Sequence, residues 1–464
     1  MSNWIPDLSR GGVPKYRAIV EAIAADLAAG RLVAGTRLPT HRDLAWRLGV
    51  TVGTVARAYA EAERQGLLSG EVGRGTFVRD PDHGDRALAQ YLNEAADLRS
   101  GLINMAVNRP DGDQGAWAVG PVLARLARRN DLSALLSYRF ESLSVRQRTA
   151  GAAWLSGMDG VRVAPDFVAV TAGSQQAILA ALSVMTVPGD GVAVEEYTYP
   201  GIKSAVSLMA RTLMPVSMDE QGLLPDEVER AFAKGAKVLY TTAAVQNPLT
   251  MTLPDDRRRA IAAAARRHGA FIIEDGVHRF LDPEAPPPIL AHAPERSVYL
   301  STLSKSVCPG LRTAFAAVPP ALRGHFDSAV GALTLSLPAV LIEAACVLIE
   351  DGQAFEIATG QRDEARARAE LAVAALGEQV RPHSPSFNVW LPLAPPWRSA
   401  DLIAEAARRG VAIAPTETFA VGRPARDGVR LSVSCPPDRE QLRTGLAIVA
   451  DILATPPALP RLTV

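Results

Sequence analysis

The chain has 464 residues, of which 48% are hydrophobic and 21% are charged. This length exceeds what one ordinary core holds, so two or three domains are expected, and the composition is that of a globular protein. The 49 Lys and Arg balance the 49 Asp and Glu, which excludes a chain that is polybasic along its whole length.

The cysteine spacing and the apolar runs indicate which kinds of site and which cellular compartment to expect. Cys308, Cys346 and Cys435 are far apart and form no CxxC pair, so neither a zinc site nor a disulfide framework is expected, and we predict no metal. No apolar run approaches the roughly 18 residues of a membrane span. These features favour a cytoplasmic protein with no membrane partner.

The first 80 residues are typical of a small DNA-binding module. They hold 11 Lys and Arg against 8 Asp and Glu, a weak excess whose sign suits nucleic acid. Apolar residues recur at helical spacing from Tyr16 onward. A second helix is predicted from Thr40, its N-cap, to Leu48, where Gly49 closes it, and a third from Thr51 to about residue 65. This is the spacing of a helix-turn-helix.

The third helix is predicted to read the major groove, and residues 67–78 to form a two-stranded wing with a glycine-rich tip. The residues expected to reach DNA from these elements are Thr51, Val52, Gly53, Thr54, Arg57 and, at the tip of the wing, Arg74. The alternative is a capping subdomain whose arginines are merely solvated.

Four short motifs in residues 15–78 resemble the GntR-type winged helix. They are Gly-Thr-Arg-Leu-Pro at 35–39, Arg-Asp-Leu-Ala at 42–45, Leu-Gly-Val at 48–50 and Gly-Arg-Gly-Thr at 73–76. The resemblance implies that Arg42, the start of the third helix and the wing touch a double-stranded DNA operator. Val52 and Gly53 stand where the family usually has polar or basic residues, so base readout is expected from Thr51, Thr54 and groove shape.

The chain beyond the winged helix (13–79) consists of a linker predicted at 80–102 and an α/β part at 103–464. Within the latter we expect a large domain at about 130–325 and a small one at about 326–464. The predicted strands are 167–170, 191–195, 237–242, 270–274, 297–300 and 314–318, and the predicted helices are 174–185, 225–233 and 255–268. In such parallel sheets, ligands bind beyond the carboxyl ends of the strands.

Polar residues stand at those strand ends. A glycine turn with Ser174 and Gln175 is suited to a phosphate, Tyr199 offers a ring for stacking, Asn247 an amide, and Asp275 a carboxylate that a pyridinium nitrogen would pair.

Lys305 follows the strand at 297–300 and is flanked by hydroxyls. Thr302, Ser304 and Arg312 around it are suited to a phosphate. An amine beside a phosphate site is what a Schiff-base aldehyde requires. Each strand-end feature also has an ordinary structural explanation, and their joint order is what indicates a cofactor site.

This order of residues resembles the aspartate-aminotransferase superfamily, fold type I of the enzymes that use pyridoxal 5′-phosphate (PLP). The resemblance implies that Lys305 forms the internal aldimine and that Asp275 pairs with the pyridine nitrogen. It also implies phosphate contacts from Ser174, Gln175, Thr302, Ser304 and Arg312, stacking by Tyr199, and contacts to the 3′-oxygen from Asn247 and His278. Arg430 would bind an α-carboxylate, and Tyr138 would reach the neighbouring subunit's cofactor in a homodimer.

Four positions depart from that family. His278 replaces the usual tyrosine and is expected to donate to the 3′-oxygen while titrating near neutrality. Leu249 and Thr250 stand where the family has a threonine and a glycine, and Leu143 replaces another glycine. The residues implied to hold the cofactor are otherwise present, whereas the residues around the place where a substrate would bind differ from the family.

A winged helix-turn-helix followed by a PLP-dependent fold type I domain resembles the MocR-type regulators. The resemblance implies a DNA-binding regulator that senses PLP, or a small amino compound forming an aldimine with PLP. The alternatives are a working aminotransferase and a DNA-binding protein whose large domain no longer holds PLP.

Overall fold

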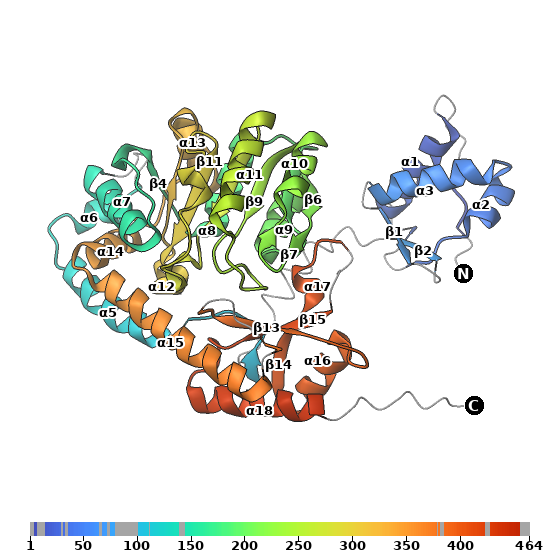
Figure 1. The fold of residues 1–464 in the computed structure, drawn as a ribbon. Coiled ribbons are helices and arrows are strands. Elements are labelled where there is room, and N and C mark those ends of the chain that lie inside the picture. The colour runs from blue at the N-terminus through green and yellow to red at the C-terminus, as the bar shows by residue number, and fades with distance from the viewer. Residues whose placement is uncertain are drawn as a thin grey trace. The chain divides into compact units, whose positions relative to one another are not determined.

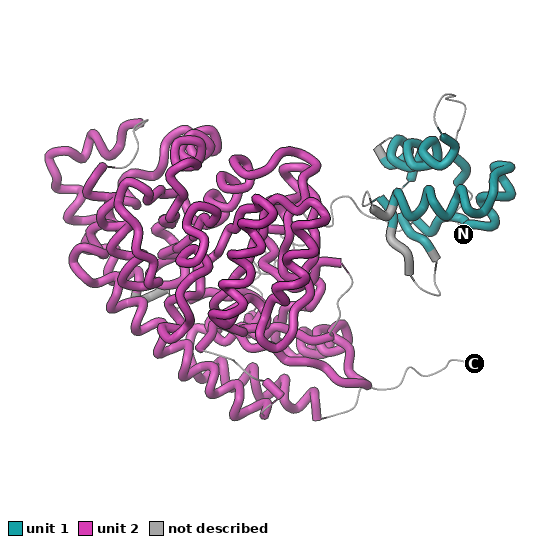
Figure 2. Tube along the Cα trace, turned by 45° about the horizontal axis from the view of Figure 1, so that its top comes forward, with its two compact units in different colours: residues 1–86 teal, residues 87–464 magenta. Residues whose placement is uncertain are grey.

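The computed structural model describes residues 4–6, 14–28, 31–32, 36–64, 67–71, 75–78, 101–110, 112–138, 144–377, 379–380, 385–422 and 427–454. The chain divides into two compact units, residues 1–86 and residues 87–464, coloured teal and magenta in Figure 2.

The first unit is a winged helix. Its elements are α1 (Lys15–Ala28), α2 (His41–Leu48), α3 (Val52–Arg64) and the antiparallel strands β1 (Leu68–Glu71) and β2 (Gly75–Val78). The Thr40 hydroxyl accepts a hydrogen bond from the backbone N of Asp43 at 3.2 Å, and Gly49, with φ of 60°, ends α2. The predicted N-cap and glycine stop are therefore confirmed, because each satisfies helix-end groups that lack an internal partner.

The core of this unit joins all three helices and the wing. Ile19 and Ile23 of α1, Leu44 of α2 and Val55 of α3 are fully buried, and Leu68 of β1 packs with them. Tyr59 is also buried, and its hydroxyl donates to the Pro39 carbonyl at 3.0 Å. The turn before α2 is thus tied to α3, which fixes the helix-turn-helix angle.

The second unit is built on a seven-stranded sheet (Figure 1). Its strands are β4 (Val168–Thr171), β5 (Gly191–Glu195), β6 (Thr212–Val216), β9 (Ala236–Thr241), β10 (Phe271–Asp275), β11 (Ser297–Thr302) and β12 (Ala314–Ala317), in the order β4-β12-β11-β10-β9-β5-β6. Only β12 runs against its neighbours. The predicted strand at 191–195 coincides with β5, and the other five predictions agree with β4, β9, β10, β11 and β12 to within two residues.

Helices cover both faces of this sheet. One face carries α8 (Ser174–Met185), α9 (Pro200–Leu208) and α13 (Arg323–Thr334); the other carries α7 (Val145–Asp159), α10 (Pro225–Ala233), α11 (Asp255–His268) and α14 (Ala339–Glu350). The three predicted helices coincide with α8, α10 and α11. Because both faces are covered, the strands are apolar on both sides, which is typical of parallel sheets.

A four-stranded sheet forms the smaller part of this unit. Its order is β13 (Asn388–Pro392), β15 (Gly428–Ser432), β14 (Val411–Pro415) and β3 (Ile103–Met105), and it packs on α15 (Gln353–Leu376), α16 (Ser399–Arg408) and α18 (Arg439–Ala454). Further α-helices and strands in the described part of this unit are α5 (Gly112–Leu126), α6 (Leu132–Leu135), α12 (Leu303–Ser306), α17 (Thr416–Phe419) and the pair β7 (Met218–Asp219) and β8 (Gly222–Leu223). Strand β3 pairs in parallel with β14, some 300 residues further on, a pairing that the sequence did not reveal.

Candidate functional site

The topology brings the predicted site residues of the second unit to one edge of the large sheet. Strands β4, β5, β9, β10 and β11 all end at that edge, because β12 is antiparallel to both β4 and β11. Arg312 precedes β12, so it lies at the same edge. The turns that follow β4, β5, β9, β10 and β11, and the turn that precedes β12, therefore lie at the same edge of the large sheet.

The glycine turn after β4 meets Arg312. Gly173 has a φ of 99°, and a Cβ added there would lie 2.5 Å from Arg312 Nη2. Arg312 Nη2 donates to the Ala172 carbonyl at 3.1 Å. The Ser174 and Ser304 hydroxyl oxygens are buried and have no hydrogen-bond partner among the described residues. Two unused hydroxyl donors, a guanidinium and the N-terminus of α8 match the donor set that a phosphate group needs.

Gln175 and Tyr199 meet at Gly201. The Gln175 side-chain N donates to the Gly201 carbonyl at 2.9 Å, and a Cβ on Gly201 would collide with both the Tyr199 ring and Gln175 Oε1. Tyr199 comes directly before α9, which places its ring beside the phosphate-type turn. Glycine is required at 201 because the two side chains fill the space that a Cβ would take.

Asp275 is held by a tyrosine that sequence reasoning missed. The Tyr240 hydroxyl donates to Asp275 Oδ2 at 2.8 Å, and the backbone N of Val277 donates to Oδ1 at 3.2 Å. Burial raises the pKa of Asp275 to about 6, although both hydrogen bonds act in the opposite direction. A carboxylate that is costly to keep charged in isolation is suited to a cationic partner such as a pyridinium nitrogen.

Strand alternation decides which carboxylate reaches this edge. Ile273 packs against α8 on one face, and Ile272 packs against α11 on the other, so Asp275 shares the α8 face and Glu274 does not. Glu274 instead forms a buried ion pair with Arg258 of α11 at 3.2 Å. The neighbouring acid is therefore structural, whereas Asp275 belongs to the edge cluster.

Lys305 lies in the short helix α12, and its amine donates to the Asn108 carbonyl. Asn108 is 3% exposed; its amide N donates to Asn388 Oδ1 at 2.7 Å, and Asn388 donates to the Pro248 carbonyl at 2.8 Å. The loop after β3 thus positions the lysine and connects it to the Asn247–Pro248 turn. Asn108 was not singled out from the sequence, because only the tertiary structure brings residue 108 to residue 305.

His278 corrects one expectation. Burial and the positive charge of Lys305 lower its pKa to about 3, so it does not titrate near neutrality. Its Nδ1 lies 3.1 Å from the Val245 carbonyl. A carbonyl only accepts, so Nδ1 carries the hydrogen and the neutral ring has an acceptor at Nε2. In this tautomer Nε2 has no hydrogen to donate to a 3′-oxygen, which differs from the predicted role.

Arg430 connects the two sheets of the second unit. It is fully buried on β15, its Nη1 donates to Asn247 Oδ1 at 3.0 Å, and its Nη2 donates to the Ala106 carbonyl. Its guanidinium carbon lies 4.5 Å from the centre of the Phe419 ring. The arginine is therefore pre-oriented beside Asn247, and a planar, desolvated guanidinium is suited to a carboxylate.

Two predicted site residues lie elsewhere or are already engaged. The Thr302 hydroxyl accepts from the backbone N of Ser304 at 3.1 Å and donates to the Thr313 carbonyl at 3.3 Å, so it caps α12. Tyr138 is 72% exposed. Thr302, the last residue of β11, therefore lies at the edge with its hydroxyl engaged by the backbone, whereas Tyr138 is exposed in the single chain.

Glu195 is a second buried acid near this edge. Its carboxylate accepts from Thr241 Oγ1 at 2.6 Å and from the backbone N of Thr242 at 2.9 Å. The other oxygen accepts from Gln246 at 3.3 Å and from Thr198 at 3.4 Å. Burial raises the pKa of Glu195 to about 7. Glu195 holds the turns that carry Tyr199 and Asn247, and it was not predicted.

In the first unit, the predicted DNA-contacting residues have different environments. Arg42, Thr51 and Val52 are exposed. Thr51 Oγ1 accepts from the backbone N of Thr54 at 3.2 Å and lies 2.8 Å from Thr54 Oγ1. Arg74 lies outside the described residues.

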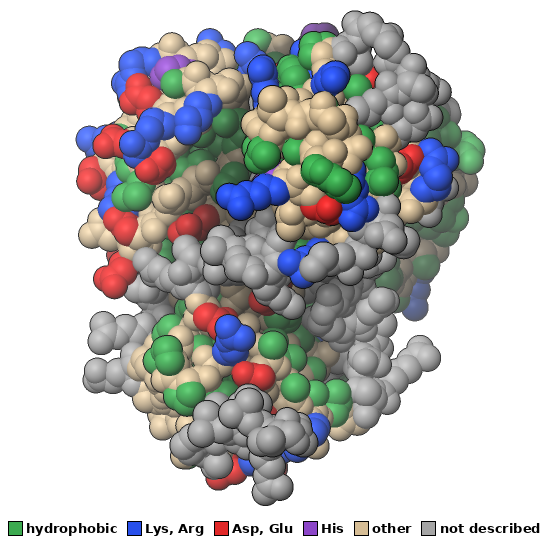
Figure 3. Space-filling view, turned by 90° about the vertical axis from the view of Figure 1, so that its right-hand side faces the viewer, with side chains coloured by type: hydrophobic (Ala, Val, Ile, Leu, Met, Phe, Trp, Pro, Cys, Tyr) green, Lys and Arg blue, Asp and Glu red, His purple; other side chains and the backbone are tan. Residues whose placement is uncertain are grey.

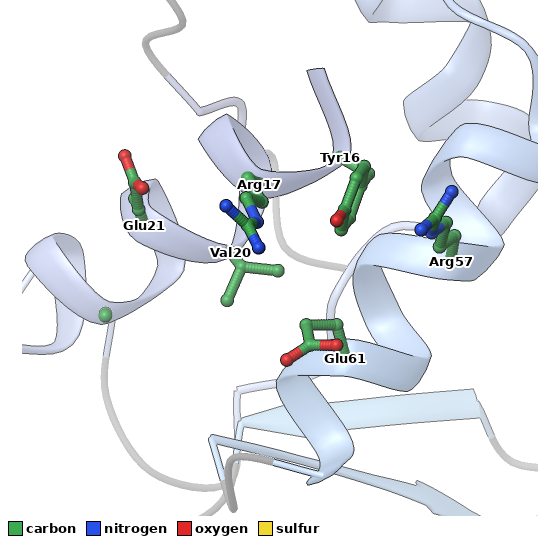
Figure 4. A pocket seen from close by; sticks show the side chains of 7 residues that line it. Tyr16, Arg17, Val20, Glu21, Arg57 and Glu61 are labelled. Atoms are coloured by element: carbon green, nitrogen blue, oxygen red, sulfur yellow. The ribbon is translucent and has the colours of Figure 1, made fainter. Parts of the chain in front are cut away.

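Arg57 packs against α1. Its guanidinium carbon lies 4.1 Å from the centre of the Tyr16 ring, at a groove of about 540 Å³ between α1 and α3 (Figure 4). The groove is lined by Tyr16, Arg17, Val20, Glu21, Ala24, Arg57 and Glu61. A cation–π contact of this kind holds the Arg57 side chain on the α1 side of α3.

The described part of the chain was also searched for membrane-spanning helices and metal sites. None of its helices is both long and apolar enough to cross a membrane. Among the same residues, no three His, Cys, Asp or Glu side chains gather as a metal ion would need. On the face in Figure 3, basic and acidic side chains are interspersed, as the balanced composition suggests.

The chain matches known families over nearly its whole length. Residues 100–449 match the family described as Aminotransferase class I and II, and residues 15–78 match Bacterial regulatory proteins, gntR family. It is 30% identical over 462 residues to the uncharacterized HTH-type transcriptional regulator YdeF of Bacillus subtilis, covering 97% of each chain. It is 29% identical to the pyridoxine biosynthesis transcriptional regulator PdxR of Corynebacterium glutamicum, covering 68% of this chain and 70% of that one.

The second unit also resembles solved structures. The kynurenine aminotransferase of Pyrococcus horikoshii superposes with a TM-score of 0.72 at 22% identity, covering 79% of this chain and 94% of that one. At this identity the likeness establishes the fold, which is that of an aminotransferase of fold type I.

Fold and matches together define a winged helix-turn-helix joined to an aminotransferase-like domain, as the sequence predicted. The chain belongs to the MocR-type regulators, the HTH-type transcriptional regulators in which these two parts are fused.

Proposed function

We propose that this DNA-binding regulator holds PLP at the edge of its large sheet and senses PLP itself or a small amino compound that condenses with it. The observation that carries the proposal is the pair of buried, unused hydroxyls of Ser174 and Ser304 beside Arg312 and Gly173. Unsatisfied buried donors are costly unless a ligand accepts from them. The relative named for pyridoxine biosynthesis supports the same class of ligand.

Different residues of the chain would bind different groups of PLP. Ser174, Ser304 and Arg312 would donate to the phosphate, and the charged form of Asp275 would accept from a protonated ring nitrogen. Bound PLP supplies an aldehyde that condenses reversibly with primary amines. The Asn108 carbonyl holds the Lys305 amine at the edge where that aldehyde would lie.

An effector carboxylate would bind at Arg430. This arginine joins Asn247 on the large sheet's edge to Ala106 beside the small sheet, so a carboxylate that takes over one of these contacts would alter how the two sheets are held together. Such a ligand changes DNA binding only through different affinities for two arrangements of the chain. We propose that the output is a change in operator affinity.

A homodimer is part of the proposal. Four large apolar side chains among the described residues of 117–145 are exposed: Trp117 is 84%, Leu136 69%, Tyr138 72% and Val145 67% exposed. Exposed apolar residues in one stretch favour a protein interface, and Tyr138 would then reach the second subunit's cofactor. The three cysteines are free, which suits the cytoplasm, where we propose that the dimer acts on DNA.

The first test is a PLP titration of the purified full chain, followed by absorbance and by binding to its promoter DNA. We expect a visible band that Lys305→Ala removes and DNA binding that changes when PLP or an amine is added. Lys237→Ala is the matched control, since Lys237 is exposed on β9.

Two results would contradict the proposal. DNA affinity that is the same with and without PLP and amines would refute sensing. Steady turnover of an amino donor and an oxo acid, without specific DNA binding, would favour the working aminotransferase, for which Lys305, Asp275 and Arg430 would suffice.

A further inference from the structure

Most of the exposed residues along α3 have small, apolar side chains, and Arg57 lies among them. Val52, the first residue of α3, is 46% exposed, and Gly53, Ala56 and Ala60 are exposed on the same side of the helix. Val52 is absent from the core cluster of this unit. An exposed β-branched residue at the first position of the helix contributes neither to the core nor to the cap.

The polar groups near this face also make contacts within the protein. The Thr51 hydroxyl accepts from the backbone N of Thr54 and lies within hydrogen-bond distance of the Thr54 hydroxyl. The Arg57 guanidinium lies over the Tyr16 ring. The first four residues from Thr51 carry neither an amide nor a guanidinium side chain, so the bidentate contacts that usually identify guanine or adenine are not available from the start of α3.

In the major groove, the apolar group that distinguishes one base from the others is the 5-methyl of thymine. The absence of a Cβ at Gly53 and the single methyl at Ala56 allow α3 to approach the base edges closely, which a valine contact requires because its side chain is short. Arg42 is exposed at the start of α2 and is suited to a backbone phosphate, which positions without specifying sequence.

We propose that Val52 recognises a thymine 5-methyl group, so that each bound winged helix reads its operator at this position by apolar contact. The inference rests on the binding of DNA by α3, and it adds the base type and the chemical group that is read. It also accounts for the valine and glycine that replace the family's usual polar residues at 52 and 53.

The test begins with in vitro selection of duplex DNA by the full-length protein. Each thymine of the selected site is then replaced by deoxyuridine, which removes the methyl and keeps base pairing. We expect one thymine per bound winged helix at which this change weakens binding about fourfold, the factor that corresponds to one buried methyl-sized group. At other thymines the change should have little effect.

Val52→Ala should bind the thymine and uracil sites equally, because its shorter side chain no longer reaches the methyl. Alanine favours a helix more than valine does, so the variant is expected to fold. Val187→Ala is the matched control: Val187 is 63% exposed in the second unit, and this variant should keep the wild-type preference for thymine.

The outcomes separate the inference from what it rests on. If selection enriches no sequence, specific DNA recognition fails and the inference fails with it. If a site is enriched but no thymine is sensitive to uracil, or if Val52→Ala keeps the wild-type sensitivity, the role of Val52 is refuted while DNA binding stands.

Discussion

Tyr240 favours the charged form of Asp275 against the effect of burial, and replacing Tyr240 with Phe tests this. The change removes the hydroxyl that donates to Asp275 Oδ2 at 2.8 Å. Burial already raises the pKa of Asp275 to about 6. A hydrogen bond to a buried charge is worth about 1.5–3 kcal/mol, and one pKa unit corresponds to about 1.4 kcal/mol. We therefore expect the pKa of Asp275 to rise by about one to two further units in the variant.

The consequence is a shifted pH dependence of PLP binding. At pH 7, Asp275 is about nine-tenths ionised in the wild type and would be between about a half and a tenth ionised in Tyr240→Phe. A neutral carboxyl forms no ion pair with a protonated ring nitrogen. The PLP dissociation constant, measured by absorbance titration from about pH 5.5 to about pH 9, should therefore show its inflection one to two units higher in the variant. PLP's own titration is common to both proteins and cancels in the comparison.

Tyr299→Phe is the matched control. Tyr299 is 1% exposed on the adjacent strand β11, and its hydroxyl has no hydrogen-bond partner in the described part of the chain. The same substitution there should leave the inflection where it is. Equal inflections in wild type and Tyr240→Phe, or equal shifts in both variants, would refute the assigned role of Tyr240.

Three further predictions concern other parts of the molecule. Gly173→Ala should weaken PLP binding tenfold or more, because the alanine Cβ would lie 2.5 Å from Arg312 Nη2. Gly235→Ala is the control for backbone strain, since Gly235 has a φ of 105° and open space around it. Equal losses of PLP affinity in the two variants would contradict the steric reasoning. Burial raises the pKa of Glu195 to about 7, so its contribution to the free energy of unfolding is present at low pH and is lost as pH rises through about 7. Glu195→Gln should therefore gain up to about 3 kcal/mol relative to wild type between pH 5 and pH 8 in urea unfolding, and parallel pH profiles would rule this out. Arg42→Ala should weaken DNA binding across sequences and reduce the salt dependence by about one unit of slope; an unchanged slope would place Arg42 away from phosphate.

Much of the site was accessible from the sequence because its parts are local. The glycine turn before α8, Asp275 at the end of β10 and Lys305 after β11 each follow an apolar strand whose position the residue pattern predicts. Parallel strands bring such ends together by topology alone. The partners of these residues were not accessible: Asn108, Tyr240 and Glu195 act across 197, 35 and 46 residues of sequence, and no local pattern marks them.

The sequence by itself determined the order of the two parts, the three helices and wing of the first unit, and the residues at the strand ends, because periodicity, caps and turn residues are properties of neighbouring amino acids. Only the tertiary structure decided how those residues are charged and engaged. Burial beside Lys305 keeps His278 neutral, contact with Tyr16 holds Arg57 on the α1 side of α3, and pairing with β14 brings the loop after β3 to Lys305 and Arg430. Protonation and hydrogen bonding depend on desolvation and on distant partners, which a linear pattern does not contain.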